Sequence, residues 1–168
     1  DAVNLAVFAY NCGVDAIIIQ DLGLATILHN NYPEIVLHAS TQMTVHNLAG
    51  VKQLENLGFQ RVVLSRELSF EEIDYIRKNT DVELEVFIHG ALCISYSGQC
   101  LFSSMVGNRS GNRGMCAQPC RLPYELYSNK NILDKGYLLS PRDQNAIDFL
   151  PNLIKSGIDC FKIEGRLK

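Results

Sequence analysis

Three segments of the chain repeat one arrangement of apolar and polar positions: residues 12–21, 57–67 and 156–166. Each has a glycine, a polar or charged position, a short run rich in Ile, Val, Leu or Phe, and then polar residues. The glycines suit the left-handed position that ends a helix. Short and nearly continuous apolar runs are typical of strands buried on both faces. The arrangement therefore predicts buried strands that follow helices.

Helical spacing fills most of the chain between these runs. Apolar residues recur at helical intervals in four segments, namely residues 1–13, 22–30, 45–57 and 143–157. A fifth helix, at residues 69–78, opens with a capping box of Ser69 and Glu72. Pro151 predicts that the last helix bends or restarts at that point.

Two further apolar runs, residues 35–40 and 82–90, predict two more strands. Strands and helices that alternate through short links predict an α/β fold with parallel βα repeats and right-handed crossovers. An open sheet and a barrel both fit this alternation.

Polar side chains stand just past the end of five predicted strands. In a parallel α/β fold these positions share one rim, where active sites form. For any single residue the ordinary explanation is that polar residues end strands, but five strand ends in succession favour a site. The residues concerned are Gln20, Asp21, His38, Ser40, Thr41, Gln42, Ser65, Arg66, Glu67, His89, Glu164 and Arg166.

Residues 91–136 interrupt the repeating pattern. This segment is rich in Gly and Ser, shows no helical spacing and holds four of the six cysteines. A long irregular insertion in a compact domain is usually functional. Residues 124–128 and 136–140 predict a hairpin or small subdomain. The predicted organisation is βα repeats of a partial barrel in residues 1–90, the Cys-rich insertion in 91–136, and a returning βα unit in 137–168.

The four clustered cysteines follow the spacing C-x6-C-x15-C-x3-C, from Cys93, Cys100, Cys116 and Cys120. Zinc ribbons prefer two C-x2-C pairs, and ferredoxin spacings also differ. Glycines between the cysteines allow the turns that wrap a chain around a cluster and aim amide hydrogens at sulfurs. The favoured interpretation is that these cysteines bind an iron–sulfur cluster or a zinc ion. Buried or redox-active thiols and disulfides are the alternatives.

Charge around the cysteines supports a negatively charged cluster. No Asp or Glu occurs from residue 86 to 124, whereas three arginines do. The Gly-rich loop 107–114 carries two of them, Arg109 and Arg113, and suits phosphate or RNA contact; a solvated loop is the plain alternative. Cys12 is expected in the core, and Cys160 is the reserve ligand if Cys120 points elsewhere.

Composition describes an ordinary globular domain. The chain has 168 residues, 47% of them hydrophobic and 20% charged, with a net charge of -3, so the chain as a whole does not suit binding to polyanions. It has neither an apolar run of about 20 residues nor a secretory signal pattern. We therefore expect a cytoplasmic protein with no membrane contact, where clustered thiols favour metal binding or catalysis over disulfides. Without an initial Met, and with a helix already under way, it reads as a fragment.

The block EVFIHGALCISYSGQCLFSSMVGNRSGNRGMCAQPCR at residues 85–121 resembles the signature of the U32 family, the collagenase-like peptidases. KIEGR at 162–166 and LHASTQM at 37–43 resemble two further motifs of that family. The resemblance covers nearly the whole chain, which looks like the middle of a family member. It implies a fragment of a TIM-barrel-like domain with an irregular Cys-rich insertion. Such a fragment also exposes sheet edges through which it can self-associate.

The resemblance also implies chemistry. Better-understood members are iron–sulfur hydroxylases that act on tRNA, ribosomal RNA or ubiquinone precursors, some with prephenate as oxygen donor. Carried over by motif, Cys93, Cys100 and Cys116 match ligands of a 4Fe–4S cluster, and Cys120 fits the variable fourth position. The sequence looks most like the bacterial enzymes that make 5-hydroxyuridine in tRNA.

Two functions follow as hypotheses. In an RNA hydroxylase that acts on tRNA, rim residues hold the substrate and the oxygen donor: His89, Glu164 and Arg166 as catalytic residues, and His38, Gln42 and Arg66 as substrate-binding residues. Arg109 and Arg113 of the basic loop also bind the substrate, by steering the RNA backbone. In a peptidase, Cys93 with His89, or Ser95 or Ser97, supplies a nucleophile. Neither a G-x-S-x-G nor an HExxH pattern is present. A third possibility is that the fragment alone is inactive.

Overall fold

The computed structural model describes residues 1–165, apart from the side chain of Asn112. Helices and strands alternate along the first half of the chain, as the apolar pattern predicted. The elements are α1 (Ala2–Asn11), β1 (Ile17–Ile19), α2 (Leu22–Asn31), β2 (Leu37–Ala39), η1 (Thr41–Met43), α3 (Leu48–Asn56), β3 (Arg61–Val63), α4 (Phe70–Lys78), β4 (Glu83–Gly90), α5 (Phe102–Gly107), η2 (Gly111–Arg113), η3 (Pro119–Arg121), β5 (Tyr124–Ser128), β6 (Asn131–Gly136), β7 (Gln144–Asn145), η4 (Ile147–Phe149), α6 (Leu150–Lys155) and β8 (Cys160–Glu164).

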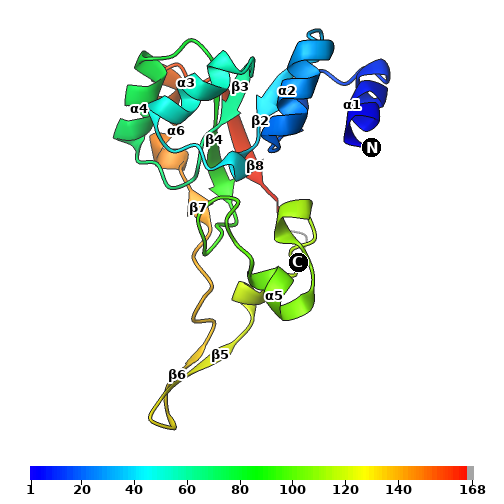
Figure 1. Ribbon diagram of the computed structural model, residues 1–168. Coiled ribbons are helices and arrows are strands. Elements are labelled where there is room, and N and C mark those ends of the chain that lie inside the picture. Colours follow the sequence, from blue (N-terminus) through cyan, green and yellow to red (C-terminus); the bar gives the residue numbers. More distant parts are fainter. Residues whose placement is uncertain (166–168) are drawn as a thin grey trace.

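The main sheet is built from parallel βα units. β1, β2, β3 and β4 pair in that order, and β8 pairs in parallel with β4 (Figure 1). The short β7 adds an antiparallel pairing at the end of β4. Within residues 1–165 β1 pairs with β2 alone and closes no ring with β8. The α/β class with parallel βα repeats is confirmed, whereas the TIM-barrel fragment stays a prediction.

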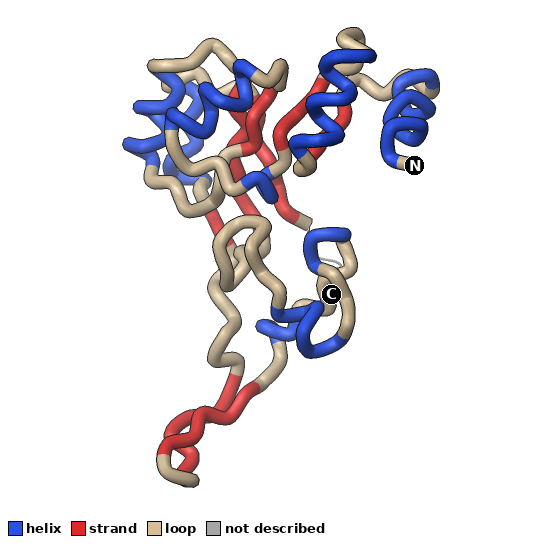
Figure 2. Tube along the Cα trace, viewed as in Figure 1, coloured by secondary structure: helices blue, strands red, loops and turns tan. Residues whose placement is uncertain are grey.

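One face of the sheet carries the hydrophobic core. Alternate strand residues such as Leu37, Val62 and Leu84 are fully buried and pack with residues of α2, α3, α4 and α6. Each such side chain contributes about 1.5–3 kcal/mol when it leaves water. Figure 2 shows these helices and the parallel strands gathered at one end of the molecule, with the β5–β6 hairpin at the other.

The opposite face of the sheet carries most of the polar strand residues. The prediction of strands buried on both faces is confirmed for β3 and β4, where Val63 and Phe87 on this face are 1% and 6% exposed, and is wrong for β1. Ile18 is 53% exposed. His38 on β2 lies opposite Arg61 on β3, and Glu85 on β4 binds Lys162 on β8 at 2.8 Å. Strand residues alternate between faces, so Ile18, His38 and Glu85 each follow a residue that packs in the core and point away from it.

Three local predictions are corrected. The Cys-rich segment contains a short helix, α5, where no helical spacing was found. The return strand of the hairpin is residues 131–136, because Asn129 and Lys130 both have positive φ and make a two-residue turn. The last helix begins at Leu150, so Pro151 lies in its first turn, where its missing N–H is harmless.

The first helix is less buried than its apolar stripe predicts. Leu5 and Phe8 are 67% and 65% exposed, and Cys12, expected in the core, is exposed. α1 packs against α2 and leaves this stripe uncovered (Figure 1). Within the described residues, no helix is both long and apolar enough to cross a membrane.

A close approach between β4 and β8 gives a stability prediction. Gly90 has φ +115, and a Cβ there would lie 2.1 Å from the Glu164 carbonyl oxygen; Gly157, at φ +82, has open space around it. In the complete natural protein we expect Gly157→Ala to cost about 1–2 kcal/mol, the backbone penalty alone. Gly90→Ala should cost about 1–3 kcal/mol more, because the strands must separate. Urea unfolding measures both, and equal losses would contradict the close approach.

Candidate functional site

Four cysteines line one cavity at the carboxyl end of the parallel sheet. Cys93 and Cys100 come from the loop after β4, Cys116 follows η2, and Cys120 lies in η3. The cavity has a volume of about 240 Å³. Its other walls come from η1, from the ends of β3 and β8, and from the Cys-rich segment: Thr41, Gln42, Arg66, Ile94, Ser97, Gly98, Phe102, Ser103, Gly111, Pro119 and Glu164. The four cysteines that the sequence analysis grouped by spacing therefore line one cavity.

The three other cysteines of the cavity affect the titration of Cys120. Burial raises the pKa of the Cys120 thiol, the Arg121 guanidinium opposes this, and the thiols of Cys93, Cys116 and Cys100 raise it further. The backbone N–H of Gln118 donates to the Cys116 sulfur at 3.3 Å. Amide donors of this kind stabilise negative charge on sulfur.

The side chains available as metal ligands indicate which metal group fits the cavity. Within residues 1–165, no three side chains of the types His, Cys, Asp and Glu stand ready to hold a single metal ion. Four sulfurs around one zinc ion would lie within about 4 Å of one another, because Zn–S bonds are about 2.3 Å long. A 4Fe–4S cluster binds each thiolate to a different iron, so sulfurs spread over the walls of a cavity suit it better. Four thiols fit that group chemically, and the Glu164 carboxylate of the same cavity is paired with Arg66.

A charged pair forms the wall of the cavity next to the sheet. Arg66 donates from Nη2 to Glu164 Oε2 at 2.5 Å, and its guanidinium carbon lies 4.1 Å from the centre of the Phe87 ring. Arg66 Nε and Thr41 Oγ1 are buried and have no partner among the described residues. Because Arg66 and Thr41 both line the cavity, these two groups are suited to an oxygen-bearing ligand.

Some predicted site residues do not line this cavity. His89 is exposed and lines a separate apolar cavity with Asn145 and Ile163. His38 lies within β2 on the polar face of the sheet. Arg109 and Arg113 are exposed in the Cys-rich segment, and Arg109 Nε donates to the Met115 carbonyl oxygen. Arg166 is outside the described residues.

Cys160, the reserve ligand, is also kept away from the cavity. It begins β8 and lies opposite Glu85 on β4. Burial and the Glu85 carboxylate, which accepts a hydrogen bond from the thiol, both raise the pKa of Cys160. Cys120 takes the fourth place beside Cys93, Cys100 and Cys116 instead.

The structure adds Arg121, which the sequence analysis did not place in the site. Arg121 donates to the carbonyl oxygens of Leu92 and Pro141 and to the hydroxyl of Ser140, at 2.5 to 2.6 Å. Arg121 thereby ties residue 92, just before Cys93, to residues 140 and 141, and it directly follows Cys120. Thr41 could be predicted from the sequence because it is a polar residue just past a strand end. Arg121 showed no such feature apart from its positive charge.

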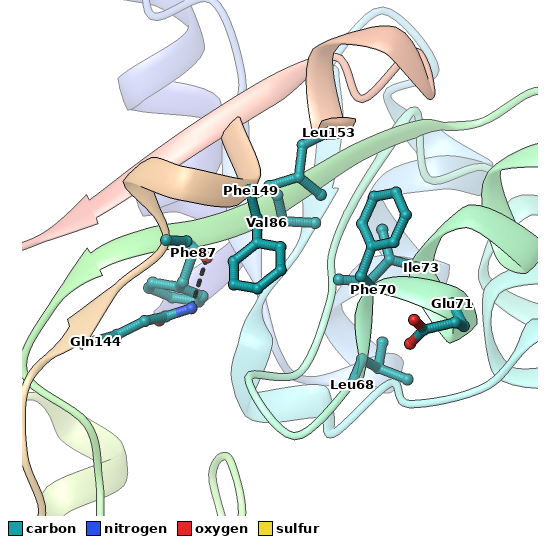
Figure 3. Close-up of a pocket in the computed structure, with 10 residues that line it drawn as sticks. Leu68, Phe70, Glu71, Ile73, Val86, Phe87, Gln144, Phe149 and Leu153 are labelled. Atoms are coloured by element: carbon teal, nitrogen blue, oxygen red, sulfur yellow. Dashed lines mark hydrogen bonds between the residues drawn. The ribbon is translucent and has the colours of Figure 1, made fainter. Parts of the chain in front are cut away.

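A second cavity, of about 330 Å³, is apolar and lies between α4, β4 and α6. Figure 3 shows the rings of Phe70, Phe87 and Phe149 around it, with Glu71 at its edge. The Gln144 side chain donates to the Phe87 carbonyl oxygen at 2.9 Å and holds β7 against β4. This cavity lacks a group of converging polar side chains, so it does not compete with the cysteine cavity as a catalytic site.

Comparison with known proteins agrees with the cysteine signature. The sequence model described as Peptidase family U32 matches residues 1–168. The chain belongs to peptidase family U32. A U32 relative, the 23S rRNA 5-hydroxycytidine C2501 synthase of Escherichia coli (strain K12), is 45% identical over 99% of this chain and 25% of its own length. The tRNA hydroxylation protein P1 of Bacillus subtilis (strain 168) is 39% identical over 94% of this chain and 39% of its own length.

The U32 fold is also found in a solved structure. The U32 peptidase Mk0906 aligns with 98% of this chain and 60% of its own chain, with a TM-score of 0.56 and 16% identity. At that identity the likeness shows the fold alone. This U32 chain spans about a quarter to two fifths of the length of the two curated relatives.

The polar face of the sheet yields a pH prediction. Burial and the Arg61 guanidinium lower the pKa of His38 from its ordinary value of 6.5, against an opposing effect of Glu85 and Glu83. The neutral imidazole is therefore favoured in the folded protein. The unfolded chain binds the extra proton first, so the His38 contribution to stability is present above pH 6.5 and is lost as the pH falls toward the lowered pKa.

NMR titration of the His38 ring should give a pKa below 6.5, and Arg61→Gln should move it upward. Lys52→Gln, which removes an exposed cation paired with Glu55, is the matched control and should leave it unchanged. A His38 pKa that is insensitive to Arg61→Gln would contradict this electrostatic account.

Proposed function

We propose that the protein is an iron–sulfur-dependent hydroxylase of RNA, with uridine in tRNA as its substrate. The observation that carries the proposal is the cavity lined by Cys93, Cys100, Cys116 and Cys120 beside the Arg66–Glu164 pair. The names of two relatives, a ribosomal RNA hydroxycytidine synthase and a tRNA hydroxylation protein, support the reaction class. The parallel sheet is proposed to be part of a TIM-barrel-like domain, with the polar face inside it.

Hydroxylation replaces a C–H bond of the base with C–OH, which is a two-electron oxidation, and it requires an oxygen donor that is reduced in turn. When bound, a 4Fe–4S cluster supplies electron transfer or activation of that donor. The four cysteines would hold it. Thiolate ligands suit iron, and the N–H of Gln118 and the cation of Arg121 offset negative charge on the sulfurs.

The surroundings of Arg66 are suited to bind the oxygen donor, which we propose to be prephenate. A guanidinium forms two parallel hydrogen bonds with a carboxylate, and Arg66 Nε is buried without a partner. Glu164 orients the guanidinium through its hydrogen bond, and Phe87 supports it by stacking. Gln42 and Thr41 supply further polar groups on the facing wall.

Of the three predicted catalytic residues, Glu164 has the strongest support because it lines the cavity. Its carboxylate can hold or accept a proton beside the bound oxygen donor. Arg109 and Arg113 are exposed in the basic segment and are proposed to contact the RNA backbone. The roles of His89, His38 and Arg166 stay predictions.

Peptide hydrolysis is the second candidate because the family and the solved structure carry a peptidase name. The local geometry supports it less well. Ser97 is 2% exposed, and its hydroxyl donates to the Glu67 carboxylate, so this serine is not open to a substrate. His89 lines a different cavity from Cys93, so the suggested Cys–His pair has no support.

The cluster proposal makes a prediction about metal content. Anaerobically prepared protein should contain about four irons per chain and absorb visible light. Cys93→Ser and Cys116→Ser should each remove most of the iron and the colour, because each takes away a thiolate. Cys160→Ser and Cys12→Ser change cysteines outside the cavity and should leave both intact. Iron that is absent, or insensitive to the first two changes, would overturn the proposal.

Nucleoside analysis of RNA from a deletion strain tests the substrate. Hydroxylated uridine should disappear from tRNA and return with the wild-type gene, but return at least about tenfold more weakly with Arg66→Gln, because a bidentate charged contact is lost. Loss of hydroxycytidine from ribosomal RNA instead would keep the reaction class and correct the substrate. Unchanged tRNA and ribosomal RNA, together with cleavage of peptides by the purified protein, would favour the peptidase.

A further inference from the structure

A buried serine in the loop that carries Cys93 and Cys100 is bound to a carboxylate in the turn after β3. Ser97 lies between Cys93 and Cys100 and is 2% exposed. Its backbone N–H donates to Glu67 Oε1 at 3.0 Å. Its hydroxyl lies 3.2 Å from Oε1 and 3.1 Å from Oε2 of the same carboxylate. Hydrogen bonds to an ionised acceptor are about twice as strong as neutral ones.

The same residue is held from its other side by the turn after β2. The Thr44 hydroxyl donates to the Ser97 carbonyl oxygen at 2.6 Å. The Gln99 side chain donates to the Thr44 hydroxyl at 2.8 Å. The N–H, the carbonyl and the hydroxyl of Ser97 are therefore all paired, which an irregular loop segment achieves only when it is docked.

Backbone contact completes the docking. Gly98 has φ +74, and a Cβ at this position would lie 2.5 Å from the Gln42 carbonyl oxygen and 2.7 Å from its Cα. Neither neighbour is the end of a flexible side chain. A glycine is thus required for the cysteine loop to rest on η1.

We infer that Glu67 is a positioning residue that sets the loop carrying Cys93 and Cys100 in register with the rest of the cavity. Glu67 directly follows Arg66, and Thr44, which binds Ser97, closes the turn that begins at Thr41 and includes Gln42. Arg66, Thr41 and Gln42 all line the cavity. The Glu67 carboxylate thereby links the loop that carries Cys93 and Cys100 to the part of the cavity wall that contains Arg66. This inference rests on the proposed function, because it concerns the geometry of the proposed cluster site.

The first test uses the metal-free, reduced form of the complete natural protein. Hydrogen exchange at residues 93–100, and alkylation of Cys100 relative to Cys12, report whether the loop is docked. Glu67→Ala should accelerate both by roughly tenfold, as expected for loss of a charged acceptor. Glu67→Gln keeps an oxygen that accepts from the Ser97 N–H and should restore rates close to those of the wild type.

Gly98→Ala and Gly114→Ala form a matched pair for the backbone contact. Both glycines have φ +74, but Gly114 has nothing within 4 Å of an added Cβ. Both changes carry the same backbone penalty, so Gly98→Ala should accelerate exchange at residues 93–100 and alkylation of Cys100 like Glu67→Ala, and clearly more than Gly114→Ala does. Equal effects of the two changes would contradict docking of the loop on η1.

The positioning role needs a readout that a general loss of stability would not change. After anaerobic reconstitution with iron and sulfide, Glu67→Ala should shift the EPR signature and reduction potential of the cluster, and Glu67→Gln should move the EPR signature back. Circular dichroism at 25 °C confirms that each variant is folded. Unchanged exchange, alkylation and EPR in folded Glu67→Ala would overturn the inference, whatever the activity.

The two proposals fail in different ways. Wild-type protein that takes up no iron contradicts the proposed cluster function, whereas the exchange and alkylation rates still decide whether Glu67 docks the loop. Wild-type protein that binds iron, with exchange, alkylation and EPR unaffected by Glu67→Ala, contradicts the inference and leaves the proposed function standing.

Discussion

The pairing of β4 with β8 is the constraint on which the rest of the structure depends. Gly90 allows the backbone of Glu164 to approach, and the two strands run in parallel to this point. The Cys-rich segment leaves the sheet directly after β4, and the chain returns through β7 and β8. Both ends of the segment are therefore held at one edge of the sheet, where the carboxyl ends of parallel strands meet. The position of the cysteines follows from this.

The two faces of the sheet have different structural roles. The apolar face packs against the helices, and burial of its side chains stabilises the fold. The polar face carries Glu85 between two cations, at 2.8 Å from Lys162 and 3.7 Å from Arg61. A buried carboxylate without such partners would be strongly destabilising. The same face continues through Phe87 to Arg66, so that a row of charged side chains leads to the cysteine cavity.

Members of this family carry names that describe two different chemistries, peptide hydrolysis and RNA hydroxylation. Local contacts separate the two for this chain. The hydroxyl of Ser97 is committed to Glu67, which suits a structural role rather than attack on a substrate. The cysteines line a cavity with an arginine and a carboxylate, and unpartnered buried groups point to a ligand there. These contacts support the proposal of a redox site with a small acidic co-substrate over that of a hydrolytic site.

The order of strands and helices, the capping box at Ser69 and the four cysteines of the site were readable from the sequence, because periodicity, caps and residue spacing are local properties. Tertiary structure alone decided which strand-end residues meet. His38 and His89 obey the same local pattern as Gln42 and Arg66 but lie outside the cavity. It also decided that Cys120 rather than Cys160 joins the other cysteines, and that Glu67 holds Ser97, 30 positions away. Such choices depend on how strands pair and loops dock, and contacts between distant residues leave no mark in local spacing.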